Sequence, residues 1–571
     1  MTLAVKGEMF IYAPLNTEAI PVLQRIEVAT FFQLPSFHLV GLPGPEVAES
    51  KERVRAAIES SQLSFPKGRV VVNLSPADIK KRGTGLDLGV ALAVLSASLC
   101  ADSPEIRLGA WAELGLDGSV KPAGQITRTL YAAWKGRLKA LVVCESELSE
   151  AEAALQCLHK SREMEGPAPG LIPVMNLRDA WQILSNWKQN PTPWPRSSQD
   201  VAALVEPGVL RAQESDEVAD LLPLSPAIER ILGVIVSGKH HFLVLGPKGV
   251  GKSHLVEWLI CLQPPLSPQD DLKQRLLREL ADASSGHSLG RSELGGGRVA
   301  SVPVRWVSSQ VRPSALIGGW SGGLIRPGEY SLAHGGLLIA DEFPEWGRDS
   351  RESLREPLER KKVSVTRAQG AFELPTDFQF IATGNLCPCG GWPAQLGGGS
   401  SLESDASARG APRCRCAFGV SRSYLSKLSG PVLDRIDCVV LWRGSHPSAE
   451  MGLAPEDGSR SRAMSERVQV LRERLDETRA RAIQNFGQFP GLLKGAEVES
   501  ILQKRCAESW SQFVHLHPEL IATGSHRARH KMARIAFSLS AWDREPSPTL
   551  SHWIEASYYR PEKLASFNEL S

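Results

Sequence analysis

Residues 246–253 have the composition of a loop that binds phosphate groups. An apolar run at 241–245 (HFLVL) leads into GPKGVGKS, and a helix-forming run follows it. Glycines let the backbone N–H groups of such a loop turn toward phosphate oxygens, and the helix N-terminus adds positive potential. The lysine of this pattern reaches the β- and γ-phosphates of a nucleotide, and the serine hydroxyl binds Mg²⁺. We therefore predict a nucleotide site that contains Gly246, Gly249, Gly251, Lys252 and Ser253.

Two adjacent acids end another apolar run, at 336–342 (GLLIADE). In a nucleotide hydrolase, Asp341 would belong to the Mg²⁺ shell, and Glu342 would orient or deprotonate the attacking water. An acidic pair at a strand end without catalytic role is the alternative. Because the pair follows a phosphate-binding loop, we favour the catalytic interpretation.

Three further polar residues complete a hydrolytic set. Asn385 ends the apolar run at 378–385 (FQFIATGN), where its amide can position water; a turn-forming Asn is the alternative. Arg435 lies between a short helical run and the strand-like 438–441, so it can reach the γ-phosphate bound by a neighbouring subunit. Arg527 opens a helical run and can contact the same nucleotide. For each arginine, a surface salt bridge is the alternative.

Four of the ten cysteines form two Cys-x-Cys pairs on either side of a low-complexity insertion at 397–410. Four thiolates in two close pairs suit tetrahedral Zn²⁺. Since all four coordination positions would be filled, the ion would be structural. The common Cys-x₂-Cys spacing is absent, and four free cysteines are the alternative. The predicted ligands are Cys387, Cys389, Cys414 and Cys416.

The elements that must position these groups fall into three blocks and a linker. Residues 1–185 alternate strand-like and helical runs, and 222–445 alternate as a parallel α/β sheet would. Residues 186–221 read as a linker because their first part is rich in proline and polar residues. Residues 446–571 read as helical. We predict an α/β protein with an α+β N-terminal domain, a central P-loop sheet domain and a C-terminal helical lid.

Periodicity supports individual elements of this division. A helix is predicted from Pro45, because Val47, Val54 and Ile58 share one helical face and proline favours the first turn. Buried strands are predicted at 69–74 (RVVVNL) and at 141–143. In the last block, one apolar face consists of Met464, Val468, Leu471 and Leu475.

Composition limits the class of protein. The chain has 571 residues, 42% of them hydrophobic and 22% charged, as expected of a globular protein with several domains. We find no apolar run long enough to span a bilayer and no signal-peptide pattern at the start, so we expect a cytoplasmic protein with reduced cysteines and no membrane partner. A net charge of +2 is low for a dedicated nucleic-acid-binding domain, but a ring-shaped motor can concentrate basic loops in its channel.

Several segments of the sequence, spread over nearly the whole chain, resemble the magnesium-chelatase-like AAA+ ATPases. Among these, they resemble the competence-protein ComM type. The resemblance implies a hexameric ATP-driven motor that binds DNA and drives branch migration of recombination intermediates, notably in natural transformation. It implies Arg435 as an arginine finger acting on the neighbouring subunit and Arg527 as a lid sensor. The matching segments are 37–44 (FHLVGLPG), 49–55 (ESKERVR), 315–319 (ALIGG), 327–334 (PGEYSLAH), 341–345 (DEFPE), 387–390 (CPCG) and 429–437 (SGPVLDRID).

Candidate DNA contacts are two segments that would face a ring channel. Residues 360–370 alternate like a hairpin and carry Arg360, Lys361, Lys362 and Arg367, which can contact phosphates in a salt-sensitive manner. Residues 318–329, with Arg326, form the second segment. Stacking aromatic residues are not obvious in either, so base-specific recognition is not expected. The alternative function is a chelatase-type ATPase that remodels a protein partner.

Two departures from the resemblance concern function. The family carries an Arg-Ala-Pro-His-His motif at this place. Here Arg305 is followed by 306–309 (WVSS), so both histidines are missing. The N-terminal block resembles the Lon-protease type of fold, but Asp87 stands where those proteases have a nucleophilic serine, and 124–130 (GQITRTL) lacks their lysine. Without a hydroxyl nucleophile and an amine base, acyl-enzyme chemistry cannot start. We predict a non-proteolytic domain.

Overall fold

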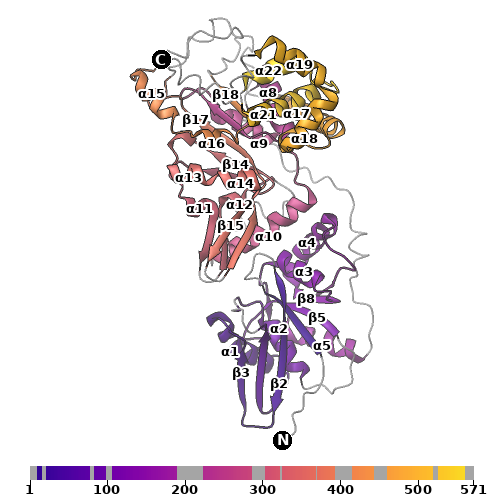
Figure 1. The fold of residues 1–571 in the computed structure, drawn as a ribbon. Helices are drawn as coiled ribbons and strands as arrows, with labels where there is room; N and C mark the ends of the chain where they lie inside the picture. Colours follow the sequence, from indigo (N-terminus) through magenta and orange to yellow (C-terminus); the bar gives the residue numbers. More distant parts are fainter. Residues whose placement is uncertain are drawn as a thin grey trace.

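The computed structural model describes residues 9–15, 21–76, 81, 83–97, 106–189, 221, 223–285, 302–321, 324–367, 370–391, 414–442, 459–518 and 525–559. The molecule is elongated, with the N-terminal body at one end, a central sheet body in the middle and a group of C-terminal helices at the other end (Figure 1). The predicted mixed α/β class with a parallel central sheet is confirmed. The predicted insertion at 397–410 lies outside the described residues.

A seven-stranded mixed sheet forms the N-terminal body. Its middle strands β2 and β1 are antiparallel, and β1, β5, β8 and β9 run parallel to one another. The strand order is β3 (Ser36–Val40), β4 (Arg69–Ser75), β2 (Val22–Phe31), β1 (Met9–Leu15), β5 (Ile106–Trp111), β8 (Ala140–Cys144) and β9 (Gly170–Val174). The helices are α1 (Pro45–Ser60), α2 (Asp87–Ser96), α3 (Ile126–Lys135), α4 (Leu148–Ser161) and α5 (Leu177–Gln189).

The periodicity of the sequence explains these elements. Helix α1 begins at Pro45, and Val47, Val54 and Ile58 are fully buried, so the predicted helix and its apolar face are confirmed. Strands β4 and β8 confirm the two predicted strands of this body. Helix α5 continues to Gln189, so the first four residues of the predicted linker, 186–189, are helical.

The central body contains a five-stranded sheet in which every pair of neighbours is parallel. Because the strands run the same way, their carboxyl ends meet at one edge, where polar loops can share a site. Apolar side chains fill all four positions of β10 and of β14, as expected for a sheet covered on both faces. The strand order is β11 (Val304–Val307), β14 (Leu337–Ala340), β17 (Gln379–Gly384), β10 (Phe242–Leu245) and β18 (Cys438–Leu441).

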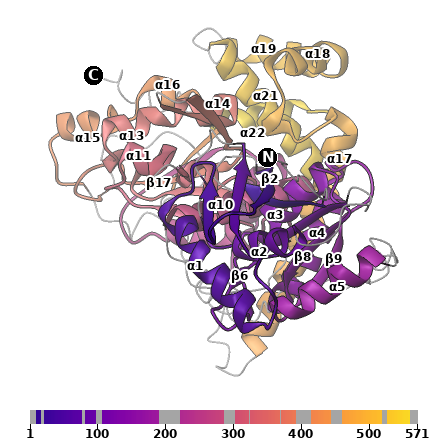
Figure 2. The same cartoon turned by 90° about the horizontal axis from the view of Figure 1, so that it is seen from below.

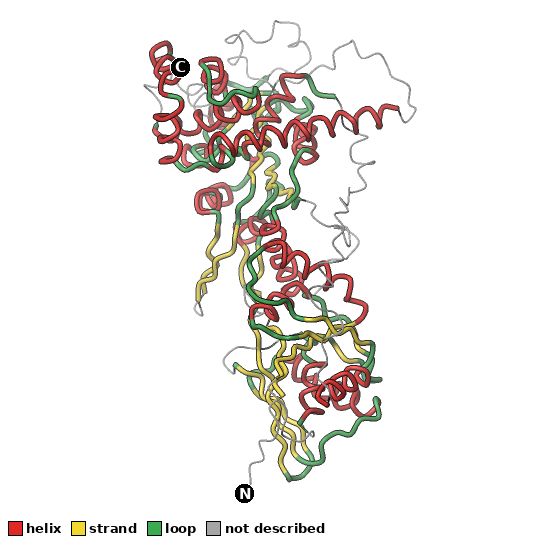
Figure 3. Tube along the Cα trace, turned by 90° about the vertical axis from the view of Figure 1, so that its right-hand side faces the viewer, coloured by secondary structure: helices red, strands yellow, loops and turns green. Residues whose placement is uncertain are grey.

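Helices surround this sheet, and two hairpins extend from it away from the C-terminal helices (Figure 3). The first hairpin pairs β12 (Gly318–Ser321) with β13 (Leu324–Pro327), and the second pairs β15 (Lys362–Arg367) with β16 (Gly370–Pro375). A hairpin was predicted at 360–370; the observed one begins later, at Lys362, because Arg360 still belongs to a helix, and it continues to Pro375. The helices are α8 (Pro226–Gly238), α9 (Lys252–Cys261), α10 (Pro268–Ser285), α11 (Pro313–Ile317), α12 (Glu329–Leu332), α13 (Arg348–Ser353), α14 (Arg355–Arg360), α15 (Phe418–Leu425) and α16 (Gly430–Leu433).

The C-terminal helices pack on the sheet body through α8, and the two share one hydrophobic core. Met464, Val468, Leu471 and Leu475 are all buried in it, as their periodicity predicts. The Ser525 hydroxyl accepts a hydrogen bond from the Ala528 N–H and so caps α21. The helices are α17 (Ser459–Phe486), α18 (Gly495–Arg505), α19 (Ala507–Leu516), α21 (His526–Trp542) and α22 (Leu550–Tyr558).

Helix α10 of the central body packs against α3 and α4 of the N-terminal body. In the view from below, the N-terminal body lies in front of the central body (Figure 2). The Glu279 carboxylate accepts hydrogen bonds from the backbone N–H groups of Thr127 (2.9 Å) and Arg128 (2.8 Å) at the start of α3. A carboxylate at this place satisfies two helix N–H groups that have no partner within the helix. The Arg128 guanidinium donates to the Leu276 carbonyl, and burial lowers the pKa of Arg128 to about 10.

Across the described residues, each helix is too short or too polar to traverse a lipid bilayer.

Candidate nucleotide-binding site

The glycine-rich loop leaves the carboxyl end of β10 and enters α9 at Lys252. Gly249 and Gly251 have φ values of +81° and +85°, which other residues rarely adopt, so this loop shape depends on glycine. Gly246 leaves no room for a side chain, because a Cβ there would lie 2.2 Å from the Trp442 carbonyl oxygen. The strand, loop and helix thus have the arrangement that the motif requires.

Lys252 is the centre of this loop's hydrogen bonding. Its amine donates to the carbonyls of Gly246 (3.0 Å) and Pro247 (2.6 Å) and to Oδ1 of Asn385 (3.1 Å). Burial lowers the pKa of Lys252, against the opposing effect of Asp341 and Glu342. The structure therefore brings the predicted lysine and the predicted asparagine into direct contact, although Lys252 begins α9 and Asn385 follows β17.

Asp341 and Glu342 follow β14 at the same edge, and both are exposed. Glu342 adopts φ +48°, an uncommon value for a residue other than glycine, and its carbonyl accepts a 2.7 Å hydrogen bond from the Glu345 N–H. Ser253 is exposed at the first turn of α9. The loop, both acids and Asn385 therefore meet at the carboxyl edge of one sheet.

Thr383 is a residue of this site that the sequence analysis missed. Its hydroxyl donates a hydrogen bond to Oδ1 of Asp341 and accepts one from the Glu342 N–H (3.3 Å). Thr383 is buried, so this hydroxyl fixes the Asp341 carboxylate from the side opposite to solvent. The available signal was the spacing: Thr383 lies in β17, two residues before Asn385, which follows the strand, and residues two apart in an extended chain point to the same face.

Arg435 and Arg527 lie at the opposite edge of the sheet. Arg435 precedes the amino end of β18, between α16 and the strand, as predicted. Its guanidinium pairs with the Glu359 carboxylate and donates to the Arg355 carbonyl (3.2 Å), while Arg527 pairs with the other Glu359 oxygen (3.3 Å). The hydrogen bond from Arg435 lowers the pKa of Glu359. A single carboxylate thus joins the two arginines.

A polar cavity of about 610 Å³ opens beside these arginines. Arg435, Arg527, Lys531 and Glu359 are among its lining residues, and so is His241 at the amino end of β10. In the contacts of the described residues, neither arginine reaches the P-loop of its own chain.

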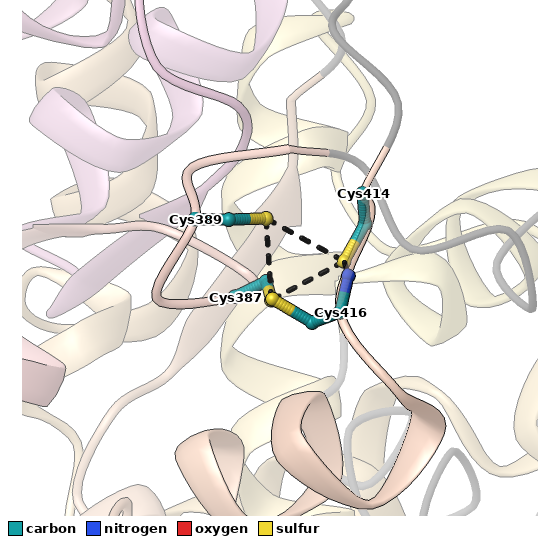
Figure 4. A group of neighbouring side chains, drawn as sticks. All are labelled: Cys387, Cys389, Cys414 and Cys416. Carbon is teal, nitrogen blue, oxygen red and sulfur yellow. Dashed lines mark hydrogen bonds between the residues drawn. The ribbon is translucent and has the colours of Figure 1, made fainter.

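The two Cys-x-Cys pairs come together in the structure (Figure 4). The sulfurs of Cys387, Cys389 and Cys414 are 3.3–3.6 Å apart, and all four ligand sulfurs, including that of Cys416, lie within 4.8 Å of one another. A tetrahedral zinc site with Zn–S bonds of about 2.3 Å places its sulfurs about 3.8 Å apart, so the group fits this ion. The N–H of Gly391 donates to the Cys389 sulfur and lowers its pKa to about 6, which favours the thiolate.

Asp87, at the position of the protease nucleophile in the resemblance, is fully buried at the start of α2. It accepts hydrogen bonds from Nε of Arg53 (2.7 Å) and from a second Arg53 nitrogen (3.2 Å). This contact raises the pKa of Arg53. A carboxylate held in such an ion pair has neither the hydroxyl nor the base that acyl transfer needs.

The basic residues of the second hairpin have acidic partners in the structure. Lys362 pairs with Glu373 across the hairpin (2.7 Å), and Lys361 pairs with Asp377 (3.1 Å). Both pairs are exposed, and such pairs contribute about 0–1 kcal/mol, so a phosphate can replace the acid at little cost. The side chain of Arg367 lies outside what the structure describes.

Two aromatic residues join the hairpins. Trp320 of β12 and Phe372 of β16 pack edge to face, with ring centroids 5.4 Å apart. Trp320 belongs to the segment 318–329, in which no stacking aromatic residue was expected, and Phe372 lies beyond the predicted hairpin, so the pair was not predicted.

Comparisons with known proteins agree with this geometry. Residues 225–449 match the family of the magnesium chelatase subunit ChlI, and residues 26–147 match a second description of subunit ChlI of Mg-chelatase. The first range contains the P-loop, the acidic pair, Asn385, the four cysteines and Arg435.

Whole-chain relatives come from several bacteria. The chain is 30% identical over 541 residues to the uncharacterised protein Rv2897c of Mycobacterium tuberculosis, covering 94% of this chain and 95% of that protein. It is 28% identical over 565 residues to the competence protein ComM of Haemophilus influenzae, covering 98% of both chains. It is 27% identical over 554 residues to the uncharacterised protein YifB of Escherichia coli, covering 96% of both.

Proposed function

Because the chain belongs to the magnesium-chelatase-like, ComM-type family of AAA+ ATPases, we propose that it is an ATP-driven motor that moves DNA strands during recombination. The single observation that carries ATP hydrolysis is the meeting of Lys252, Asn385, Asp341 and Glu342 at the carboxyl edge of one parallel sheet. A phosphate-binding loop, a metal-binding carboxylate and a carboxylate base at one edge are the parts that phosphoryl transfer to water requires.

Each residue has a separate role in this proposal. Lys252 would bind the β- and γ-phosphates by exchanging its carbonyl partners for phosphate oxygens. Ser253 and Asp341 would hold Mg²⁺, which would supply positive charge against the charge that develops on the phosphates. Glu342 takes a proton from the attacking water, and Asn385 positions that water. Asn385 also contacts Lys252, so one side chain connects the lysine to the water position.

Glu342→Gln tests this assignment. The variant should bind ATP and hydrolyse it about 10²-fold more slowly or worse, because the amide cannot accept the proton. The control is Glu345→Gln, a nearby exposed acid whose partner is Lys427. Wild-type turnover in Glu342→Gln would contradict the role of this carboxylate.

The proposed motor is a ring of identical subunits, and six is the number that the family resemblance implies. Arg435 and Arg527 support a ring, because they face away from their own P-loop and line a polar cavity of about 610 Å³. In a head-to-tail ring, this edge of one subunit meets the P-loop edge of the next. We assign Arg435 as the arginine finger and Arg527 as the lid sensor for the neighbour's nucleotide.

DNA is the proposed substrate. The Haemophilus influenzae relative is a competence protein, and each hairpin carries an exposed basic residue, Arg326 on the first and Lys362 on the second. Trp320 and Phe372 join the hairpins, so the two segments would move together when the ATPase changes state.

The experiment for this proposal is ATPase activity with and without single-stranded or branched DNA. Stimulation that falls as salt rises is expected for phosphate contacts. Lys362→Glu should abolish the stimulation and keep the basal rate, whereas Lys504→Glu on the lid is the matched control. Absence of stimulation by either DNA form would favour the alternative, an ATPase that remodels a protein partner.

One structural zinc ion per chain completes the proposal. Cys387, Cys389, Cys414 and Cys416 present four sulfurs at the spacing of a tetrahedral site. Metal analysis should find one zinc per chain, lost in Cys414→Ser. Absence of zinc from freshly reduced protein would contradict the site.

A further inference from the structure

The four-cysteine group is attached directly to the nucleotide site. Cys387 is buried and comes two residues after Asn385, whose side chain contacts Lys252. The chain then turns through Cys389 and Gly390, and the Gly390 N–H donates to the Cys387 carbonyl (2.9 Å). This turn therefore continues the chain that leaves β17 through Asn385.

The same turn contacts the P-loop. The N–H of Lys248, inside the loop, donates a 2.8 Å hydrogen bond to the Gly390 carbonyl. Gly390 has φ +75°, and a Cβ at this position would lie 3.1 Å from the Cβ of Lys248. The two backbones thus approach as closely as glycine allows, and the turn supports the P-loop from outside.

The two halves of the cysteine group come from distant positions of the chain. Cys387 and Cys389 belong to the turn, whereas Cys414 and Cys416 lie just before α15. The contacts among their sulfurs are weak hydrogen bonds of 3.3–3.6 Å (Figure 4). An ion that binds all four would fix the turn to the start of α15 far more firmly than these contacts do.

We infer that zinc at the four cysteines holds the Gly390 turn against Lys248, so that the affinity of the P-loop for nucleotide depends on the metal. This inference rests on the proposed nucleotide site. The chemistry involves no electron transfer: four thiols lose their protons to solvent, and four sulfur–zinc bonds form. The site acts as a positioning element, because none of its sulfurs reaches the loop residues that would touch nucleotide.

Three variants of the full chain separate zinc binding from its effect on the P-loop. Cys414→Ser with Cys416→Ser removes two ligands and leaves the turn sequence intact. Gly390→Ala keeps all four ligands and strains the turn at the place where it contacts Lys248. Gly487→Ala is the matched control, because Gly487 also has a positive φ (+85°) but an added Cβ there meets nothing within 4 Å.

The measurements are zinc content and the Kd of a fluorescent ATP analogue with Mg²⁺. The wild type should hold one zinc and bind the analogue. The double cysteine variant should lack zinc, and Gly390→Ala should keep it. In both, Kd should rise about tenfold, as expected for loss of about one hydrogen bond. Gly487→Ala should match the wild type in both measurements.

Other outcomes overturn the inference in distinguishable ways. Unchanged Kd in the zinc-free variant, or in Gly390→Ala, would show that the metal does not support the P-loop. A wild type with zinc that fails to bind the analogue would contradict the proposed nucleotide site as well. A wild type that binds the analogue but contains no zinc would leave the nucleotide site standing and remove the metal site.

Discussion

Lys252 and Arg435 lie at opposite edges of the same parallel sheet. Lys252 follows the carboxyl end of β10, and Arg435 precedes the amino end of β18, which is the neighbour of β10 in the sheet. The four-residue strand between these edges spans about 13 Å. Two residues that are both predicted to touch a γ-phosphate are thus held apart within one chain. A shared site requires two chains.

Mixing two inactive variants tests this relationship. Lys252→Ala should lose ATP binding, and Arg435→Ala should lose about 10³-fold in turnover. In an equal mixture, about one quarter of head-to-tail interfaces combine an intact P-loop with an intact finger, so about one quarter of the wild-type rate should return. The measurement is steady-state ATPase, with Arg69→Ala as a control at an exposed arginine of the N-terminal body. Mixtures as inactive as their components would rule out the shared site.

Thr383 should control the metal dependence of hydrolysis. Thr383→Val removes the hydrogen bond to Asp341, so the carboxylate loses its fixed orientation. The Mg²⁺ concentration for half-maximal ATPase should rise about tenfold, the usual effect of losing a partner behind a metal ligand. Thr383→Ser should restore the wild-type value, because serine keeps the hydroxyl. Equal Mg²⁺ dependence in all three proteins would mean that Thr383 only packs.

The Arg53–Asp87 ion pair should stabilise the N-terminal body without catalysing proteolysis. Asp87→Ala leaves a largely buried guanidinium without its carboxylate partner. We expect a loss of about 2 kcal/mol, below the value for fully buried pairs because Arg53 is 19% exposed and Glu49 lies 3.8 Å away. Denaturant-dependent hydrogen exchange of the peptides that contain α1 and α2 measures it. ATP-stimulated casein cleavage by the wild type, abolished in Asp87→Ala, would overturn the non-proteolytic assignment.

Glu279 should hold the N-terminal body against α10. Glu279→Ala leaves the N–H groups of Thr127 and Arg128 without their carboxylate acceptor. Hydrogen exchange of the peptide that contains the start of α3 should become about tenfold faster, as expected for loss of charge-assisted hydrogen bonds. Lys273→Ala, on the same helix, is the control. Unchanged exchange at α3 would show that other contacts maintain the interface.

Local pattern was sufficient to predict the strand, the glycine-rich loop and the helix around Lys252. A glycine-rich loop between a strand and a helix is specified by consecutive residues, so Gly249, Gly251 and Lys252 were predictable. Asp341 and Asn385 were predictable for a related reason: each follows an apolar strand, and parallel strands bring their carboxyl ends to one edge. Apolar periodicity likewise predicted the buried faces that include Val54 and Leu475.

Local pattern did not predict where the last helix of the N-terminal body ends. The linker was expected from residue 186, but α5 continues to Gln189, because polar residues without proline can extend a helix. Domain boundaries stay a prediction.

Contacts between distant residues were decided only by the tertiary structure. Glu359 joins Arg435 to Arg527, Glu279 caps α3, and the Gly390 carbonyl meets the Lys248 N–H. The sequence shows which side chains can donate or accept hydrogen bonds, but it does not show which of them pair. Any exposed carboxylate or carbonyl could accept a hydrogen bond from the same donor. Which pair forms depends on how packed helices and strands bring remote backbone segments within about 3 Å of each other, and no periodicity along one chain encodes that approach.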